Sequence, residues 1–507
     1  MRPSSACSPG RPCNAPKRPT PDPNSAVPKL NTTTVGWLAG SAMLLLAAAG
    51  WWVDAPYVLA VPVAALLAYW AFARLDLYMG VVLALVPLSI NLGELGLTSV
   101  GWYMPTEPML FALLLLSCAR WLSGKRLDRT LWKHPVTWVI LAGFVWMGLT
   151  ILPSSHPVVS LKAWISRAWF MVAFYFLLAA WFEHSPKAQT RFLALLLVPM
   201  CVVVTYTIVR HAGHGFGKGA GHWVMKPFFK DHTSYGAVLA MLLPPAIAMV
   251  WRKHKTALAR VLWGLGVVWL SVGTVLSYTR AAWVSLAAVG ALWAVMKLGV
   301  RLKPLLAASV VALGGLALSW DALVVQLERN NQDSSDNFTQ HIESISNVST
   351  DDSNLERLNR WSCALAMFEE RPFWGWGPGT YQFEYAPFQT STLRTRISTN
   401  NADLGNAHSE YLGPLAEQGI LGLLAVLGLL AATLHLGFKL HRTLVDPERR
   451  AWAMGLFLGI MTYFVHGVLN NFLDTDKASA PFWGFLAILV VMDIHRSKEE
   501  EETAELT

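Results

Sequence analysis

Long apolar runs dominate the chain and are separated by polar connections. A helix needs about 20 apolar residues to cross the hydrocarbon core of a bilayer, so each run predicts a membrane-spanning helix. The predicted spans are residues 35–52, 56–73, 77–92, 104–122, 135–152, 163–182, 190–209, 234–251, 258–276, 280–297, 304–320, 411–437, 451–472 and 480–494. The even alternation of an outer-membrane barrel is missing from the sequence. The expected fold class is an all-α polytopic membrane protein with about 12 to 14 transmembrane helices.

Composition supports this class. Of the 507 residues, 54% are hydrophobic and only 14% are charged, whereas a soluble chain of this length carries more charge. The five cysteines include no CxxC pair, so neither a disulfide framework nor a zinc site is predicted. Residues 1–34 are rich in Pro, Ser and Asn and are predicted to be disordered.

Basic residues assign a side to each connection. Alternate connections and both termini carry most of the Lys and Arg residues. Because positively charged loops stay on the cytoplasmic side, these connections and termini are expected in the cytoplasm. The predicted organisation is a cytoplasmic N-terminus (1–34), a transmembrane bundle (35–320), a large periplasmic loop (321–410), C-terminal transmembrane helices (411–494) and an acidic cytoplasmic tail (495–507). The remaining connections, including the large loop, are expected to lie on the opposite side of the membrane.

The large loop is expected to contain an amphipathic helix. Apolar side chains recur there at helical spacing, at Leu355, Leu358, Trp361, Leu365 and Phe368. Such a helix is expected to lie on the outer face of the bilayer.

Two regions place positive charge on the external side. Arg280 lies between two spans in Ser277-Tyr278-Thr279-Arg280; it either contacts lipid phosphate from a helix end or binds an anion inside the bundle, for which its planar fork is suited. The glycine-rich residues 210–233 add Arg210, Lys218, Lys226, Lys230 and His232. A loop that contacts phosphates is expected there; a metal site or a merely solvated loop are the alternatives.

His408 is the candidate general base. It ends the large loop in Asn406-Ala407-His408-Ser409-Glu410-Tyr411-Leu412, with Glu417 further along. The plain alternative is a polar residue that packs near the start of the next span. Neutral imidazole accepts a proton near pH 7, and guanidinium groups stabilise charge on a leaving diphosphate. Together they suit a glycosyl transfer from a diphosphate donor.

These segments resemble the O-antigen ligase and polymerase superfamily. The resemblance rests on residues 406–422 with His408, Tyr411, Glu417, Gly419 and Gly422. It also rests on Arg360-Trp361 followed by Pro372-Phe373-Trp374-Gly375-Trp376-Gly377-Pro378-Gly379, on Ser277-Tyr278-Thr279-Arg280 and on Lys230-Asp231-His232-Thr233-Ser234-Tyr235-Gly236. Ala281 departs from the commoner glycine after the arginine.

The resemblance implies a GT-C-like helical bundle in the bacterial inner membrane, with the active site on the periplasmic side. It also implies a polyprenyl-diphosphate-linked glycan as donor, and lipid A-core or a growing glycan as acceptor. It implies that no metal and no other cofactor is needed. By position, His408 would activate the acceptor hydroxyl, and Arg280 with Arg210 would bind the diphosphate. Contacts to substrate are further expected from Lys218, Lys226, Lys230, His232, Arg360, Glu410, Tyr411 and Glu417.

The expected function is therefore an O-antigen ligase. Alternatives within the same chemistry are an O-antigen or exopolysaccharide polymerase and a protein O-oligosaccharyltransferase, which differ in the acceptor. A transporter for lipid-linked sugars is the non-enzymatic alternative, and it would spread charged residues through the spans. Membrane lipids are expected partners, and nucleic acid is not.

Overall fold

The computed structural model describes residues 41, 60–93, 95–96, 102–124, 129–253, 256–299, 352–391, 393–394, 398 and 405–505. The predicted spans 35–52 and 304–320, the N-terminal segment 1–34 and the first part of the large loop therefore lie outside the described residues. The chain divides into two units, Met1–Ala73 and Arg74–Thr507. In the first unit the structure describes helix α2 (Ala60–Ala73).

The second unit is built almost entirely of helices. They are α3 (Leu75–Leu85), η2 (Val86–Leu88), α4 (Thr106–Leu122), α5 (Arg129–Lys133), α6 (Pro135–Leu149), α7 (Pro157–Met171), the π-helical turn η3 (Val172–Leu177), α8 (Leu178–His184), α9 (Pro186–Ala212), α10 (Lys218–Gly221), α11 (His232–Trp251), α12 (Ala257–Leu276), α13 (Arg280–Lys297), α17 (Asp352–Glu370), α18 (Tyr381–Glu384), η4 (Ala386–Phe388), α19 (Leu412–Thr443), α20 (Pro447–His466) and α21 (Asp476–Glu505). Strands β1 (Ile90–Asn91) and β2 (Tyr103–Met104) pair antiparallel, with Ile90 opposite Met104.

Within the described residues, six helical stretches are long and apolar enough to cross a membrane. They are Pro157–His184, Lys187–Ala212, His232–Trp251, Ala257–Leu276, Leu412–Thr443 and Asp476–Glu502. Leu75–Leu88 and Pro135–Leu149 are apolar but shorter. Helix α12 exposes a row of large apolar side chains, including Leu258, Leu262 and Leu265, as expected of a face that contacts lipid. The chain is an all-α polytopic membrane protein.

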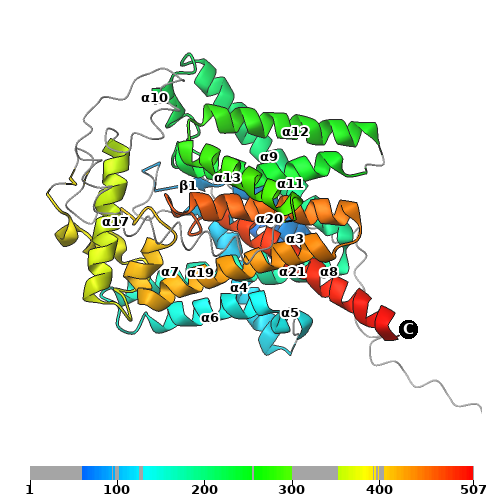
Figure 1. The fold of residues 1–507 in the computed structure, drawn as a ribbon, viewed down its shortest axis with the longest axis horizontal. Coiled ribbons are helices and arrows are strands. Elements are labelled where there is room, and N and C mark those ends of the chain that lie inside the picture. The colour runs from blue at the N-terminus through cyan, green and yellow to red at the C-terminus, as the bar shows by residue number, and fades with distance from the viewer. Residues whose placement is uncertain are drawn as a thin grey trace, which may run out of the picture. The chain divides into compact units, whose positions relative to one another are not determined.

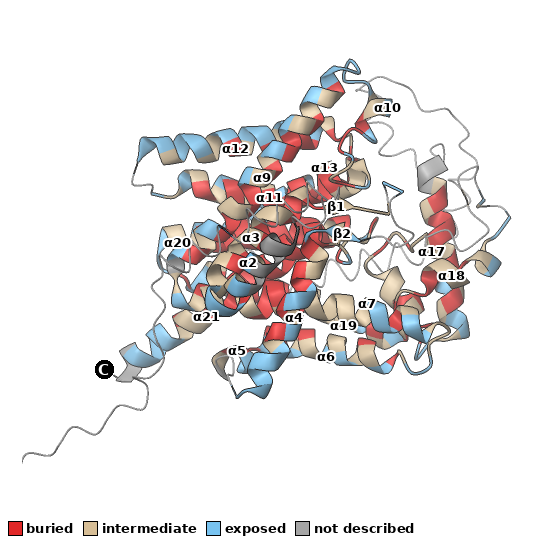
Figure 2. Cartoon of the chain, turned by 180° about the vertical axis from the view of Figure 1, so that it is seen from behind, coloured by how far each residue is buried: buried red, intermediate tan, exposed pale blue. Residues whose placement is uncertain are grey.

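The core of the second unit lies where α11, α13, α20 and α21 pack together. Figure 1 shows α11, α13, α19 and α20 running side by side, and Figure 2 shows buried residues gathered in the middle of this bundle. Helix α20 approaches α11 closely at Gly459, where an added Cβ atom would lie 2.6 Å from the carbonyl oxygen of Met241. Glycine at this position therefore allows two long helices to share a tight interface.

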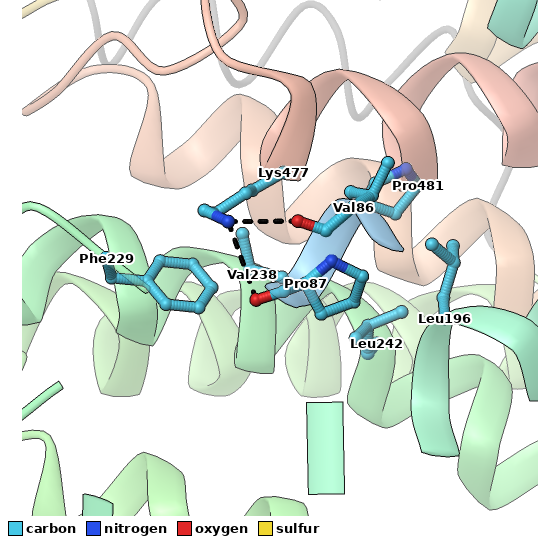
Figure 3. Close-up of a pocket in the computed structure, with 8 residues that line it drawn as sticks. All are labelled: Val86, Pro87, Leu196, Phe229, Val238, Leu242, Lys477 and Pro481. Atoms are coloured by element: carbon cyan, nitrogen blue, oxygen red, sulfur yellow. Dashed lines mark hydrogen bonds between the residues drawn. The ribbon is translucent and has the colours of Figure 1, made fainter. Parts of the chain in front are cut away.

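A buried lysine fixes the start of α21 against the end of η2. The Lys477 ammonium donates to the carbonyl oxygens of Val86 at 2.9 Å and Ser89 at 2.8 Å, and Figure 3 shows it aimed at the backbone of Val86 and Pro87. Its neighbour Asp476 accepts hydrogen bonds from Ser89 Oγ at 2.7 Å and Thr106 Oγ1 at 2.6 Å. Because unpaired charges are costly at membrane depth, these contacts account for the buried pair.

Helix α17 forms where an amphipathic helix was expected, but its buried face differs from the expected one. The buried stripe runs through Glu356, Arg360, Cys363 and Met367, whereas Leu365 is 38% exposed. The reason is that α17 packs against α19, so that Glu356 and Arg360 lie on its buried face. Figure 1 shows α17 standing across the ends of the long helices.

Two further boundaries differ from the sequence pattern. Arg210 lies within α9, which ends only at Ala212, rather than in the basic loop. Helix α21 continues through Glu505, so the acidic residues after position 494 extend the last helix.

Candidate functional site

The turn that carries Arg280 is attached to the start of α11. Asp231 caps α11 by accepting a hydrogen bond from Ser234 N at 2.8 Å, as expected for an aspartate at a helix N-terminus. Thr279 Oγ1 donates to the carbonyl oxygen of His232 at 2.7 Å. Because Arg280 begins α13 directly after this threonine, it lies beside the N-terminus of α11.

Asp231 itself is ionised at neutral pH. Burial alone would raise the pKa of this carboxyl, but hydrogen bonds from Thr233 and Ser234 outweigh it and hold the pKa below its usual range. Asp231 therefore supplies a fixed negative charge among several basic groups.

The segment before α19 holds His408 in an uncommon backbone conformation. His408 has φ of 48°, in the left-handed region that few residues other than glycine adopt. Asn406 Oδ1 accepts the His408 backbone N–H at 3.1 Å, and Trp361 Nε1 approaches the His408 carbonyl oxygen at 3.5 Å. Local backbone strain of this kind is found at functional sites, where the surrounding contacts maintain it.

Glu410 and Tyr411 anchor this segment to the connection between α20 and α21. Glu410 Oε1 accepts the backbone N–H of Phe472 at 2.9 Å and of Leu473 at 3.0 Å, together with the Tyr463 hydroxyl. The Tyr411 hydroxyl donates to the Phe464 carbonyl at 2.9 Å. Both side chains thus hold the His408 segment in place, and their expected contacts to substrate stay a prediction.

Helix α19 breaks at Gly419, and the aromatic turn of the large loop fills the break. Gly419 has φ of 69° and ψ of −165°, so the helical hydrogen-bond pattern is interrupted. Ile420 N donates to the Pro372 carbonyl at 2.9 Å, and Trp376 N donates to the Ala416 carbonyl at 3.1 Å. Glu417, buried inside this junction, accepts the Tyr381 N–H at 3.0 Å. The motif from Pro372 to Gly379 is therefore one structural unit with the start of α19.

His408 carries a neutral imidazole at neutral pH. Burial, followed by the positive charges of Arg357 and Arg360, lowers the pKa of His408 to about 4. Arg360 is held nearby by Glu356, which accepts its Nε–H at 2.6 Å, and by stacking at 3.8 Å over the Tyr385 ring. The sequence pattern placed Arg357 on the amphipathic helix without assigning it a site role.

Arg357 links the two parts of the site. Its charge acts on His408 and also on His232, and the charge of Arg280 reaches His232 as well. Asp231 acts on both histidines. Residues from four separate elements therefore converge at one end of the bundle: Arg280, Arg357, His408 and the pair Asp231 and His232.

The other basic residues expected at the site lie in the last turn of α9 and in the loop that follows it. Arg210 donates to the Val224 carbonyl at 3.1 Å and to the Lys226 carbonyl, and it lies 5.3 Å from the ring centre of Trp223. The Arg210 guanidinium thus organises residues 222–227. Lys218 begins α10, Lys226 and Lys230 are exposed, and Lys230 lies within electrostatic range of Asp474.

A metal-binding constellation is not found in the part of the chain that the structure describes, where no three His, Cys, Asp or Glu side chains gather suitably. The His222 and His232 rings stack at 4.3 Å. His222 lies in the loop and His232 begins α11, and among the described residues the two belong to no larger ligand set.

Residues 265–427 match the model of the family described as O-Antigen ligase. This stretch is an O-antigen ligase family domain. It includes Arg280, Arg357 and His408, and it leaves out Asp231 and His232 on α11. The match confirms the resemblance noted from the sequence. No curated protein matches the chain. The match supports a membrane glycosyltransferase of the ligase or polymerase type in general terms.

Proposed function

We propose that the protein transfers a glycan from a polyprenyl-diphosphate carrier to an acceptor hydroxyl, as an O-antigen ligase acting on lipid A-core. The observation that supports this most directly is that the turn carrying Arg280 is bonded to His232 at the start of α11, while Arg357 acts electrostatically on both His232 and His408. A neutral imidazole within electrostatic range of Arg357 and Arg360 joins a proton acceptor to an anion site. The domain organisation supports an active site on the periplasmic side of the inner membrane.

The reaction needs one proton acceptor and one stabilised leaving group. The acceptor hydroxyl gives its proton to the His408 imidazole while its oxygen forms a bond to the anomeric carbon of the donor glycan. The bond between that carbon and the diphosphate oxygen breaks, and the polyprenyl diphosphate leaves with the electron pair. Arg280 and Arg357 stabilise the negative charge that grows on the leaving group.

Binding of the donor would strengthen the base. The positive charges near His408 contribute to its low pKa, and a bound diphosphate neutralises part of that charge. The pKa of His408 then rises toward its ordinary value, which makes the imidazole a better proton acceptor when the donor is in place. In the empty enzyme, burial first and then the charges of Arg357 and Arg360 keep His408 neutral.

Reconstitution with defined substrates tests this function. Purified protein is incubated with one polyprenyl-diphosphate-linked repeat unit, with and without lipid A-core, and the products are separated by mass. Capture of the repeat unit on the core is expected. Chains that grow without core would identify a polymerase, and transfer only to added protein would identify a protein O-oligosaccharyltransferase. A lack of transfer to any acceptor would contradict the proposal. Loss of activity in EDTA that Mg²⁺ restores would contradict metal independence.

A further inference from the structure

An exposed aromatic pair marks the turn that fills the break in α19. Phe373 is 50% exposed and Trp374 is 42% exposed, and their rings meet edge to face at 5.1 Å. Trp376, Tyr381 and Tyr385 of the same loop are buried. Two adjacent exposed rings on a loop whose other aromatic residues pack inward indicate a contact outside the chain.

The pair adjoins the lipid-facing side of α6. Large exposed side chains recur at helical spacing along this apolar helix and just beyond its end, at Trp138, Val145, Leu149 and Leu152. Such an apolar side faces lipid in a membrane protein. Trp146, the neighbour of Val145, stacks on Trp374 at 5.2 Å and meets Phe373 at 5.4 Å. The aromatic turn is therefore continuous with a surface that contacts lipid.

Its position along α6 corresponds to the edge of the hydrocarbon core. Trp146 lies three residues before the end of α6 at Leu149, which is roughly 4.5 Å along the helix axis. The residues that precede the turn are polar, because Glu369 and Glu370 are exposed at the end of α17. Tryptophan concentrates at this level of a bilayer, where its ring contacts acyl chains and its N–H meets water.

The turn is also built into the start of α19. Trp146 Nε1 donates to the Gln418 carbonyl at 2.9 Å, and Gly377 N donates to the Glu417 carbonyl at 2.7 Å. At Gly375 the two backbones come so close that an added Cβ atom would lie 2.3 Å from the Glu417 carbonyl carbon. A force on the exposed pair therefore acts on the first turns of α19, which follow the His408 segment directly.

We propose that Phe373 and Trp374 insert into the headgroup region of the bilayer on the side of the large loop, and so fix the height of the start of α19 above the hydrocarbon core. The partner is phospholipid. A glycan would need hydrogen-bonding groups beside the rings, whereas the ring next to both is Trp146, whose N–H is already used by Gln418.

The inference does not depend on the proposed function, because it concerns only how the large loop is held. It assigns to this turn the bilayer contact that the sequence pattern suggested for α17. Figure 1 shows α17 standing across the ends of the long helices, so the turn at its end lies at the level where those helices leave the bilayer.

The test measures the depth of the pair in the full-length protein without substrate. A coumarin-bearing residue is introduced by codon suppression in place of Trp374, and the protein is placed in phosphatidylcholine nanodiscs. Three quenchers are compared: a lipid nitroxide near the glycerol, a lipid nitroxide at the end of the acyl chain, and iodide in the buffer. We expect the nitroxide near the glycerol to quench at least about threefold more than either of the others.

The same probe at other positions calibrates the depth. In place of Glu370 it is expected to be quenched mainly by iodide. In place of Leu265, which is 59% exposed in the middle of α12, it is expected to be quenched mainly by the nitroxide at the chain end. A probe in place of Phe373 is expected to reproduce the shallow depth, and it keeps the test valid if replacement of Trp374 disturbs the stack on Trp146. Matching thermal melting curves show that the fold is retained.

The other outcomes each overturn the inference. Quenching of the Trp374 and Phe373 probes by iodide alone would place the pair in water, and strongest quenching from the chain end would place it inside the core. Iodide quenching that an added oligosaccharide removes would identify a glycan platform. Protection from all three quenchers only in discs that hold two copies of the chain would identify a contact between copies. Because no measurement uses turnover, each of these results leaves the proposed glycan transfer untouched.

Discussion

Thr279 donates a hydrogen bond of 2.7 Å to the backbone carbonyl of His232, 47 positions earlier in the chain. This contact attaches the turn before α13 to the N-terminus of α11. It thereby fixes the position of Arg280, the first residue of α13. Thr279 also packs against Gly236, where an added Cβ atom would lie 2.7 Å from the threonine side chain. Arg280 is thus positioned by tertiary contacts of its neighbour.

The first prediction concerns this contact. Thr279→Val keeps the shape of the side chain and removes the hydrogen bond, which is expected to lower the free energy of unfolding by about 1 kcal/mol. Because a small displacement of a positioned group can cost much of a rate, glycan transfer is expected to fall by about tenfold. Ser285→Ala is the control, since its hydroxyl bonds only within α13. Equal activity losses in both variants would contradict the positioning role.

The second prediction concerns pH. A His408 pKa of about 4 means that the free enzyme keeps a neutral imidazole from pH 8 down to about pH 5, and that activity is lost only as the pH approaches 4. The acid limb of kcat/KM reports the free enzyme, and that of kcat reports the substrate complex. The bound diphosphate raises the pKa, so the kcat limb is expected at higher pH than the kcat/KM limb. Coincident limbs, or a kcat limb at lower pH, would argue against the proposed coupling.

The third prediction isolates Arg357. Its charge lowers the pKa of His408, so Arg357→Gln is expected to move the acid limb of kcat/KM to higher pH. The same change removes a cation from the donor site and is expected to raise the KM for the donor. Arg371→Gln is the control, because it removes an equal charge from a guanidinium that stacks 3.9 Å from the Trp376 ring. A pH profile unchanged by Arg357→Gln would remove Arg357 from the site.

The fourth prediction concerns the break in α19. In Gly419→Ala the new Cβ atom would lie 2.1 Å from the Phe373 carbonyl oxygen, at a positive φ. This change is expected to cost more than about 2 kcal/mol and to lower the melting temperature.

Gly428→Ala is the matched control in the same helix. Its Cβ atom would make an ordinary contact of 3.5 Å with Val139, and alanine favours a helix over glycine by about 1 kcal/mol. A stable Gly419→Ala protein, measured by thermal unfolding in the same detergent, would show that the break is not required by the fold.

Several features of the fold were predictable because they are local. Where the structure describes them, the long apolar runs form helices. The reason is that backbone N–H and C=O groups in lipid have no water to bond, so they must pair with one another within the helix. Asp231 before Thr233 and Ser234 is a helix start by its side-chain chemistry alone. The short sequence between Leu276 and Arg280 left room only for a tight turn.

The partners of these residues were not predictable in the same way. The sequence pointed to His408 and Arg280 through motifs, but Arg357 looked like one charged residue on an amphipathic helix. Its place beside His408 depends on α17 packing against α19, a contact between segments far apart in the chain. The spacing of polar and apolar residues predicts which face of a helix is polar. It does not predict which residue, distant in the sequence, that face contacts in the folded protein.

The sequence by itself determined a helical membrane protein, its candidate base and arginine, and its resemblance to the O-antigen ligase family. Only the tertiary structure decided that Glu410 anchors the His408 segment, that Gly419 breaks α19 around the aromatic turn, and that Phe373 and Trp374 lie exposed beside Trp146 of α6. The physical reason is the range of the interactions. Helix formation and capping act over a few residues, whereas the electrostatics and shape of a site come from groups that meet only after the chain has folded.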